Sequence, residues 1–407
     1  MKITNISICP STEGTIKLTP ELMASCFARF SRSDEGIEAI NAKVDLDDPS
    51  GSIESIFKFI DYGHASIADM VPVAMTLEKV SIFMAFYIWN NCQVVAGQES
   101  STRYLKIDEL IDLDLGAEHQ DYMNQCMEEY NRACEYFDEQ LPQSDDPKGE
   151  RLRKNKIFDR ARYFIPVAAA TNVALIMSAR CWCELSSKMQ SHYLVEFQEC
   201  GHMIAESLAV DAPHMVKHAA PKVYYTDYYD SEFVQFKMLA DSGYKENYEC
   251  ESHLWLPPQH PLNHPDLYQY HQNRYAPFHP AVSQCPVIFG WSHISMGEMR
   301  DFNRHRTGTR SAVLVPSSFY CVSYKHGLDM SVAHTKLLEG DKNYMYWTCL
   351  GHTYQWTHTT TVDKFLYQLE LRTGAGAHFK YKEHMMDVGR LWFRTAPASE
   401  EFVLVGQ

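Results

Sequence analysis

The stretch YIWNNCQVVAGQESSTRY, residues 87–104, has a layout that recurs as RDFNRHRTGTRSAVLVPSSFY in residues 300–320. Each stretch contains an apolar helix end, a small polar turn, a Ser-Ser or Ser-Thr pair and a tyrosine. A layout that recurs in this way suggests an internal duplication. We therefore expect two related domains, residues 1–225 and the more divergent residues 226–407.

The composition is that of an ordinary globular protein. The chain has 407 residues, 45% hydrophobic and 22% charged, so two or three domains are expected, because a single core rarely grows past about 250–300 residues. The longest apolar stretch, residues 80–89, is far shorter than the ~20 residues that cross a bilayer. No basic-then-apolar leader opens the sequence. These features predict a soluble, cytoplasmic protein.

Charge and metal-ligand patterns exclude several classes of partner. The net charge of −15 comes from 37 basic and 52 acidic residues, and it disfavours nucleic acid, whose phosphates are repelled. Twelve cysteines without a CxxC pair are typical of reduced, buried thiols. Residues 251–282 hold six prolines and five histidines, which predicts a long ordered loop. The histidine spacings there are irregular, so no metal site is expected.

Hydrophobic periodicity predicts the remaining elements. Residues 79–92 are expected to form a core helix, followed by a strand near residues 100–105. Residues 171–208 are expected to form one long helix or two. Residues 353–372 and 380–393 are the counterpart helices near the C-terminus.

Arg304, His305 and Arg306 place three cationic or proton-active groups in a row, with Arg310 four residues further on. Such a cluster suits a phosphate or flavin partner, because a guanidinium fork matches phosphate oxygens bidentately. The alternative is a salt-bridge network with the surplus acidic residues of the chain. Spacing alone does not decide between these interpretations.

Ser101 and Arg103 form a second candidate site. Side chains alternate along a strand, so these two would share one face, where a hydroxyl beside a guanidinium makes a compact phosphate clamp. Glu99 would lie on the same face and orient either group or a sugar hydroxyl. Without other information, an edge strand with a surface arginine is the favoured interpretation.

Two further positions are weak signals by themselves. Gly63 precedes His64, and a glycine there allows a tight turn that presents the ring to a pocket. Arg372 ends an apolar helix, where its charge also favours the helix dipole.

Taken together, these residues resemble the flavin-dependent thymidylate synthase family. The first half follows that family's order: a GHxS-type segment, an apolar helix, an SxRY segment and an AR-x-x-LP-x-x-x-x-T segment. The second half resembles its RQ-x-x-RHR-T segment and its C-terminal LR…AQ…EIR segment. The matching stretches are GHASIAD (63–69), residues 77–89, QESSTRY (98–104), ARYFIPVAAATN (161–172), RDFNRHRTG (300–308) and LELRTGAGAHFKYKEH (369–384).

The two halves depart from the family pattern in complementary ways. The RHR position of the first half holds residues 91–93, Asn-Cys-Gln. In the second half, Phe319 replaces the arginine of SxRY and Met345 replaces the arginine of AR. Members of the family are homotetramers with sites assembled from several chains. The resemblance therefore implies a homodimer of tandem chains, a pseudo-tetramer in which only one type of site is complete.

The resemblance also implies a fold and an activity. The fold is α+β, with two copies of a small antiparallel sheet flanked by long helices. The activity is reductive methylation of dUMP to dTMP with FAD, NADPH and methylenetetrahydrofolate. The implied roles are catalysis by Arg372 and Ser101; flavin binding by Arg304, His305, Arg306 and His64; and nucleotide binding by Glu99, Ser101, Arg103 and Arg162.

Three functions stay open at this point. The first is an active flavin-dependent thymidylate synthase with half the usual number of sites. The second is a related flavoenzyme that acts on another pyrimidine nucleotide. The third is a non-catalytic nucleotide-binding relative with a decayed flavin site.

Overall fold

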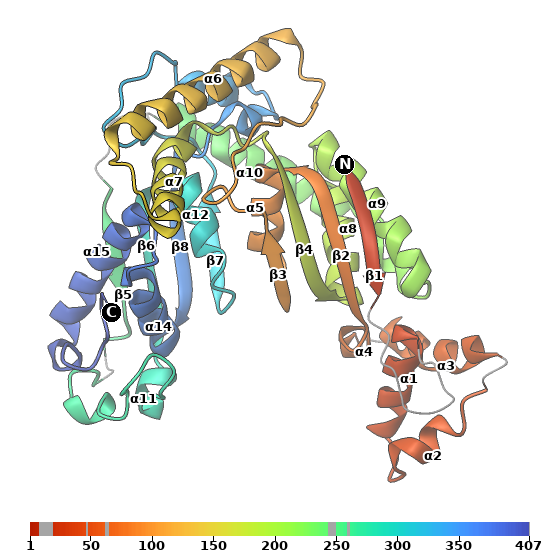
Figure 1. Ribbon diagram of the computed structural model, residues 1–407. Coiled ribbons are helices and arrows are strands. Elements are labelled where there is room, and N and C mark those ends of the chain that lie inside the picture. Colours follow the sequence, from red (N-terminus) through yellow and green to blue (C-terminus); the bar gives the residue numbers. More distant parts are fainter. Residues whose placement is uncertain (8–18, 46–47, 62–64, 243–249, 259–260, 407) are drawn as a thin grey trace. The chain divides into compact units, whose positions relative to one another are not determined.

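The computed structural model describes residues 1–7, 19–45, 48–61, 65–242, 250–258 and 261–406 (Figure 1). The chain folds into two compact units that alternate along the sequence. Unit 1 consists of Met1–Ser100, Glu109–Asp114 and Ala169–Val234, and unit 2 of Ser101–Asp108, Leu115–Ala168 and Gln235–Gln407. The expected domains 1–225 and 226–407 stay a prediction about the duplicated copies, because the compact units do not follow that single boundary.

Unit 1 is built on a four-stranded antiparallel sheet in the order β1-β2-β4-β3. Side chains of β2 and β4 alternate between buried and more exposed, as expected for a sheet with one covered face. Helices α8 and α9 pack on each other and on this sheet (Figure 1). The strands are β1 (Lys2–Ser7), β2 (Pro72–Ser81), β3 (Ala96–Glu99) and β4 (Ala170–Ser178). The helices are α1 (Pro20–Phe30), α2 (Ile37–Asn41), α3 (Pro49–Asp61), α4 (Ser66–Asp69), α5 (Ile82–Asn91), α8 (Ala179–Gln190), α9 (Val195–Asp211) and η2 (Val216–Ala219), and α10 (Val223–Asp241) continues past Val234.

Unit 2 contains a second antiparallel sheet of four strands, in the order β5-β6-β8-β7. Helices α14 and α15 pack together beside it, and α6 packs on α7 (Figure 1). The strands are β5 (Ser252–Trp255), β6 (Pro286–Ser295), β7 (Thr309–Val313) and β8 (Thr353–Thr361). The helices are α6 (Ala117–Gln140), α7 (Pro147–Ala161), η1 (Arg162–Phe164), η3 (Pro265–Leu267), α11 (Pro280–Ser283), α12 (Met296–Phe302), α13 (Val332–Glu339), η4 (Tyr344–Trp347), α14 (Val362–Thr373), α15 (Phe379–Thr395) and η5 (Pro397–Ser399).

The two sheets have the same topology and matching dimensions. Strands β2 and β6 each have 10 residues, and β4 and β8 each have 9. The helices after β4 and β8 also match, with 12 residues in α8 and α14 and 17 in α9 and α15. Each central strand pair shifts register at the same place, between Leu77 and Val80 and between Trp291 and Ile294. The expected α+β fold with two small antiparallel sheets is confirmed.

A serine starts the helix that follows each bulged strand. Ser81 accepts a hydrogen bond from the backbone N–H of Met84, and Ser295 from that of Glu298, at 2.8 and 3.3 Å. A serine at this position satisfies a backbone donor that the helix leaves unpaired. The short helix α12 therefore starts at a defined residue, and the segment that begins at Arg304 follows its C-terminal end.

Equivalent positions of the two copies meet inside unit 2. Pro166 and Cys349, each four residues before the first residue of β4 or β8, form an isolated antiparallel bridge. Around them Val167 donates to the carbonyl oxygen of Thr348 at 3.0 Å, and Leu350 donates to that of Ile165 at 2.8 Å. A reciprocal exchange between equivalent residues is the pattern of a twofold interface. The two copies of this segment are thus related by a local pseudo-twofold axis.

Three of the expected elements were wrong. The starts of residues 171–208 and 353–372 form β4 and β8, because ATNVALIMS and TYQWTHTTT alternate buried and exposed positions and are rich in β-branched residues. The strand expected near residues 100–105 ends at Glu99, and Ser101–Leu105 is a turn, in which Leu105 N–H bonds the Ser101 carbonyl oxygen at 3.1 Å. The core helix expected at residues 79–92 is confirmed as α5 (Ile82–Asn91), whereas residues 79–81 form the end of β2.

The remaining expectations concern loops and membranes. Residues 251–282 contain only β5, one 3-10 turn and the start of α11 among their described positions, which agrees with a long ordered loop. No helix in the described part of the chain is long and apolar enough to cross a membrane.

Candidate functional site

A basic cleft of about 650 Å³ lies in unit 2, where the chain leaves α12 and where α14 ends. Arg304, His305 and Arg306 line it from the segment after α12, and Arg372 lines it from the last turn of α14. The side chains of Arg304 and Arg306 belong to exposed residues. Further lining residues of the cleft are Arg274, Tyr275, Phe278, Lys364 and Tyr367. The cleft therefore combines a high positive charge with aromatic surface.

Arg372 and His305 are joined directly. Nε of Arg372 donates a hydrogen bond of 2.7 Å to Nε2 of His305. A nitrogen that accepts cannot carry a proton, so the neutral imidazole has its proton on Nδ1. Burial lowers the pKa of His305 well below its ordinary value, and the nearby Arg372, His358 and Arg310 lower it further. The ring is therefore neutral at pH 7 and fixes the plane of the Arg372 guanidinium.

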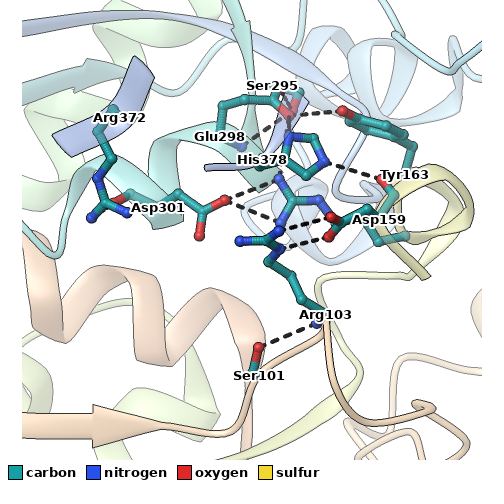
Figure 2. A network of polar contacts seen from close by, with 10 residues as sticks. Ser101, Arg103, Asp159, Tyr163, Ser295, Glu298, Asp301, Arg372 and His378 are labelled. Atoms are coloured by element: carbon teal, nitrogen blue, oxygen red, sulfur yellow. Dashed lines mark hydrogen bonds and ion pairs between the residues drawn. The ribbon is translucent and has the colours of Figure 1, made fainter. Parts of the chain in front are cut away.

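Asp301, one turn before Arg304, is the central carboxylate of the site (Figure 2). Its Oδ2 accepts hydrogen bonds of 3.1 Å from both Nη1 and Nη2 of Arg162, and its backbone oxygen accepts from Nη2 of Arg372 at 3.5 Å. Burial raises the pKa of Asp301, but Arg162, Arg304, His378 and Arg372 together hold it well below its ordinary value. Asp301 is therefore a permanent anion among arginines.

Arg103 joins the same network (Figure 2). Its Nε and Nη2 donate to the two carboxylate oxygens of Asp159 at 2.7 and 2.8 Å, and both side chains are largely buried, 19% and 8% exposed. Burial opposes the charge of Arg103, but Asp159 and Asp301 leave its pKa above the ordinary value. Ser101 Oγ accepts from the backbone N–H of Arg103 at 3.3 Å. Unit 2 thus brings the 101–103 turn and the 304–306 segment into one electrostatic cluster.

Arg162 lies deeper than the sequence suggested. Its side chain is 2% exposed and pairs with Asp301 and with Glu298, whose Oε1 lies 3.3 Å from Nη2. Tyr163 donates a further hydrogen bond of 2.9 Å to the same Glu298 oxygen. These contacts give Arg162 internal carboxylate partners rather than a place in the wall of the basic cleft.

The other predicted residues belong to unit 1 or lie outside the described residues. Glu99 is the last residue of β3 in unit 1, opposite Val173. Its expected place on one strand face with Ser101 and Arg103 was wrong, because the strand has ended by Ser101. His64 lies outside the described residues.

Sequence reasoning missed the acidic half of the site. Asp159, Asp301, Glu298 and His378 take part in the network, and Nε2 of His378 donates to the backbone oxygen of Asp159 at 3.1 Å. A signal existed for two of them: Asp159 stands three residues before Arg162 and Asp301 three before Arg304, a spacing that places both groups on one side of a helical turn. The ion pairs of this network belong to Arg103 and Arg162, so the salt-bridge interpretation of the 304–306 segment stays a prediction. Among the described residues, no group of three or more His, Cys, Asp or Glu is arranged to hold a metal ion.

Three comparisons with known proteins found similar chains. The family model described as "Thymidylate synthase complementing protein" matches residues 15–214. UPF0159 protein Ta1429 of Thermoplasma acidophilum is 22% identical over 202 residues, which cover 40% of each chain, so the chain spans about two fifths of the length of this curated relative. The flavin dependent thymidylate synthase ThyX from Helicobacter pylori, solved with FAD and dUMP, has 17% identity and a TM-score of 0.34, over 54% of this chain and 100% of that one. The UMP/dUMP methylase PolB from Streptomyces cacaoi, solved with 5-Br dUMP, has 16% identity and a TM-score of 0.36, over 53% and 94%.

Proposed function

The chain belongs to the thymidylate synthase complementing protein family, and on that premise we propose that it is a flavin-dependent thymidylate synthase. It would methylate dUMP to dTMP with FAD, NADPH as reductant and methylenetetrahydrofolate as one-carbon donor. The observation that carries the proposal is that Arg103, Arg304 and Arg372 of unit 2 all interact with the Asp301 carboxylate. His305 and Arg306 line the same cleft as Arg304 and Arg372. Each copy supplies the motif that the other has lost.

The basic cleft fits a flavin nucleotide chemically. Arg304 and Arg306 present guanidinium groups that match phosphate oxygens bidentately, and they belong to exposed residues at the cleft. Tyr275 and Tyr367 supply aromatic surface in the same cleft, against which a planar ring system can pack. When bound, the flavin supplies the hydride and carries the one-carbon unit, chemistry that no side chain provides.

The chain's own residues bind, orient and polarise. Arg372 is held by His305 through Nε and by the Asp301 carbonyl through Nη2, and its guanidinium lies 4.9 Å from the centre of the Tyr381 ring. Its Nη1 makes no hydrogen bond within the described part of the chain, so that group is the donor for a uracil carbonyl. A donor fixed in advance stabilises the negative charge that develops on the ring as C5 becomes nucleophilic.

Arg103 has the same form of preorganisation. Asp159 engages its Nε and Nη2, and among the described residues Nη1 has no hydrogen-bond partner. Nη1 and the Ser101 hydroxyl of the same turn are the proposed contacts to the nucleotide phosphate. Glu99 and His64 stay proposed as a ribose contact and a flavin neighbour. Arg162 acts on the nucleotide through Asp301. The proposed assembly is a homodimer of these tandem chains.

A matched pair of arginine variants tests the proposal. The protein is incubated with FAD, freed of excess cofactor, and assayed for dTMP formation from dUMP with NADPH and methylenetetrahydrofolate. Arg306→Ala should lose flavin and activity, whereas Arg394→Ala, an exposed arginine of α15 outside the cleft, should keep both. Equal flavin retention by the two variants contradicts the role given to the basic cleft.

A second candidate function follows from Asp301. This residue stands where the family segment RQ-x-x-RHR-T has a neutral glutamine, and its anion lies close to Arg304 and Arg372. An added negative charge weakens binding of a phosphate and alters which pyrimidine nucleotide is preferred. Flavin binding without dTMP formation, together with turnover of another pyrimidine nucleotide such as UMP, would favour this related flavoenzyme.

A further inference from the structure

Unit 2 has a second cavity, to whose lining residues the proposed function assigns no role. It measures about 630 Å³ and shares no lining residue with the basic cleft. Its walls come from the bulge of β6 at His293, the segment 316–320, the loop 328–331 and the first turns of α15 at Lys380 and His384. We call it the histidine cavity, because His293, His334, His352 and His384 line it.

The lining of the histidine cavity is mostly uncharged. Burial lowers the pKa of His352 to about 4 and that of His384 to about 3, so both rings are neutral at pH 7. Among the described lining residues, Lys380 is the one cation besides histidine; it pairs with Glu383 at 2.7 Å and lies 4.8 Å from the centre of the Tyr320 ring. No arginine is found among these described lining residues, in contrast to the basic cleft.

Two of the histidines present complementary hydrogen-bonding groups. Nδ1 of His334 lies 3.0 Å from the carbonyl oxygen of Pro316. A carbonyl oxygen only accepts, so Nδ1 carries a proton, and in the neutral form of the ring Nε2 is an acceptor. Nδ1 of His384 lies 3.9 Å from Sγ of Cys250. Burial raises the pKa of that thiol to about 11, so the thiol keeps its proton at pH 7. In the tautomer in which the thiol donates to Nδ1, Nε2 of His384 carries the ring proton. Neither Nε2 has a hydrogen-bond partner within the described part of the chain.

Aromatic rings complete the cavity. Phe319 and Tyr320 are half-buried and line it. Phe319 is fixed from behind by Phe164 and His352, at ring-centroid distances of 5.4 and 5.3 Å. Tyr320 packs edge-on against Tyr163 at 4.9 Å. Rings held in place lose little freedom when a flat ligand packs against them. Packing on an aromatic ring also accepts flat ligands of different ring chemistry.

We propose that the histidine cavity binds an uncharged heteroaromatic ring that carries both hydrogen-bond donors and acceptors. A nucleoside without its phosphate and a pterin share this chemistry. His334 accepts from the ligand, His384 donates to it, and Phe319 and Tyr320 pack against its plane. A phosphorylated ligand is disfavoured, because the lining offers one already paired cation and includes the carboxylates of Glu298 and Asp329.

The test is calorimetric titration of the full chain with uridine, thymidine, 6-hydroxymethylpterin and UMP. Leu328→Trp fills the cavity from its loop and should abolish binding of the uncharged ligand. Lys325→Trp places the same bulk on an exposed neighbour outside the cavity and should leave it unchanged. His334→Ala removes one acceptor from a half-buried position and should weaken binding about fivefold. Circular dichroism checks that each variant is folded.

The ligand series shows whether the bound ring comes from a nucleoside or a pterin. It also distinguishes the histidine cavity from the proposed active site. Binding of a nucleoside supports the proposal and selects nucleosides, and binding of the pterin alone selects pterins. Arg306→Ala should not affect either ligand, whatever becomes of flavin binding and dTMP formation. The proposal is overturned if no uncharged ligand binds, if UMP binds the cavity more tightly than uridine, or if Leu328→Trp and Lys325→Trp behave alike.

Discussion

Arg372 donates a hydrogen bond of 2.7 Å from Nε to Nε2 of His305, although the two residues come from different motifs. The contact ties the last turn of α14 to the segment that follows α12. It also fixes the tautomer of the imidazole and leaves Nη1 of Arg372 available. The RHR segment and the C-terminal arginine are thus one preassembled group.

The two residues should be energetically coupled. In a double-mutant cycle, Arg372→Gln and His305→Ala should each destabilise the protein, and the double variant should lose less than the sum. A coupling of about 1–2 kcal/mol is expected for a hydrogen bond with one charged partner. Urea unfolding measures it. The control cycle pairs Arg372→Gln with Arg394→Ala, which should be additive; equal coupling in both cycles would argue against a specific contact.

Stability should fall as the pH is lowered below 7. Folding lowers the pKa of His352 and His358 to about 4 and that of His384 to about 3, whereas the unfolded value is about 6.5. Between these pH values the unfolded chain binds more protons than the folded chain. Each such histidine therefore lowers the free energy of unfolding by about 1.4 kcal/mol for each pH unit of acidification. His271, whose pKa Glu370 raises, acts in the opposite direction.

Unfolding in urea at pH 7, 6 and 5 checks this slope. His384→Gln should make the slope shallower by about one proton, about 1.4 kcal/mol per pH unit. The contribution of these neutral histidines to the stability of the wild-type chain is lost as the pH falls from about 6.5 to the lowered pKa values. A free energy of unfolding that stays constant from pH 7 to pH 5 is incompatible with these buried neutral rings.

Arg162→Met should destabilise unit 2 strongly. The substitution copies the other half of the chain, where Met345 occupies the equivalent position, eight residues before the strand. It leaves Asp301 and Glu298 buried without their cation, which costs about 3–5 kcal/mol. The triple variant Arg162→Met, Asp301→Asn, Glu298→Gln should recover part of the loss, because no buried charge is left unpaired. If Arg162→Met alone is neutral in urea unfolding, the network does not stabilise the fold.

Arg103→Ala should weaken nucleotide binding. The loss should be about 2–4 kcal/mol in dUMP affinity, as for a partly desolvated, charge-assisted phosphate contact. Asp159→Asn is the informative partner variant, since it keeps Arg103 but releases one of its anchors; it should reduce affinity less than Arg103→Ala. Unchanged dUMP affinity in folded Arg103→Ala would mean that the turn at residues 101–103 has a structural role only.

The fold class could be predicted because the order of motifs along the chain resembles a known family, whereas local periodicity alone indicates only a mixed, helix-rich chain. Strands β4 and β8 could not be predicted, because each runs directly into a helix. A short apolar run fits both the helical and the strand period. The equivalence of Phe319 with Arg103 was inferred only from the order of the motifs along the two halves. In the structure Phe319 bridges His352, whereas the equivalent bridge to Ala169 is made by Leu110, because the two connections after the strand take different paths.

The basic half of the site could be predicted and its acidic half could not. Arg304, His305, Arg306 and Arg372 form recognisable motifs, and the structure gathers them in one cleft. Asp159 and Asp301 each stand three residues before an arginine, but that spacing does not give their partners, because the pairs Arg103–Asp159 and Arg162–Asp301 join residues from distant parts of the sequence. Such pairing is decided by tertiary packing, on which a single sequence carries no direct information.

We propose that each chain assembles one complete site from motifs of both copies. The most direct test is the visible absorption spectrum of the purified protein after FAD is added and the excess removed. We expect about one flavin per chain, lost in Arg306→Ala and kept in Arg394→Ala. Two flavins per chain, or none, would contradict it.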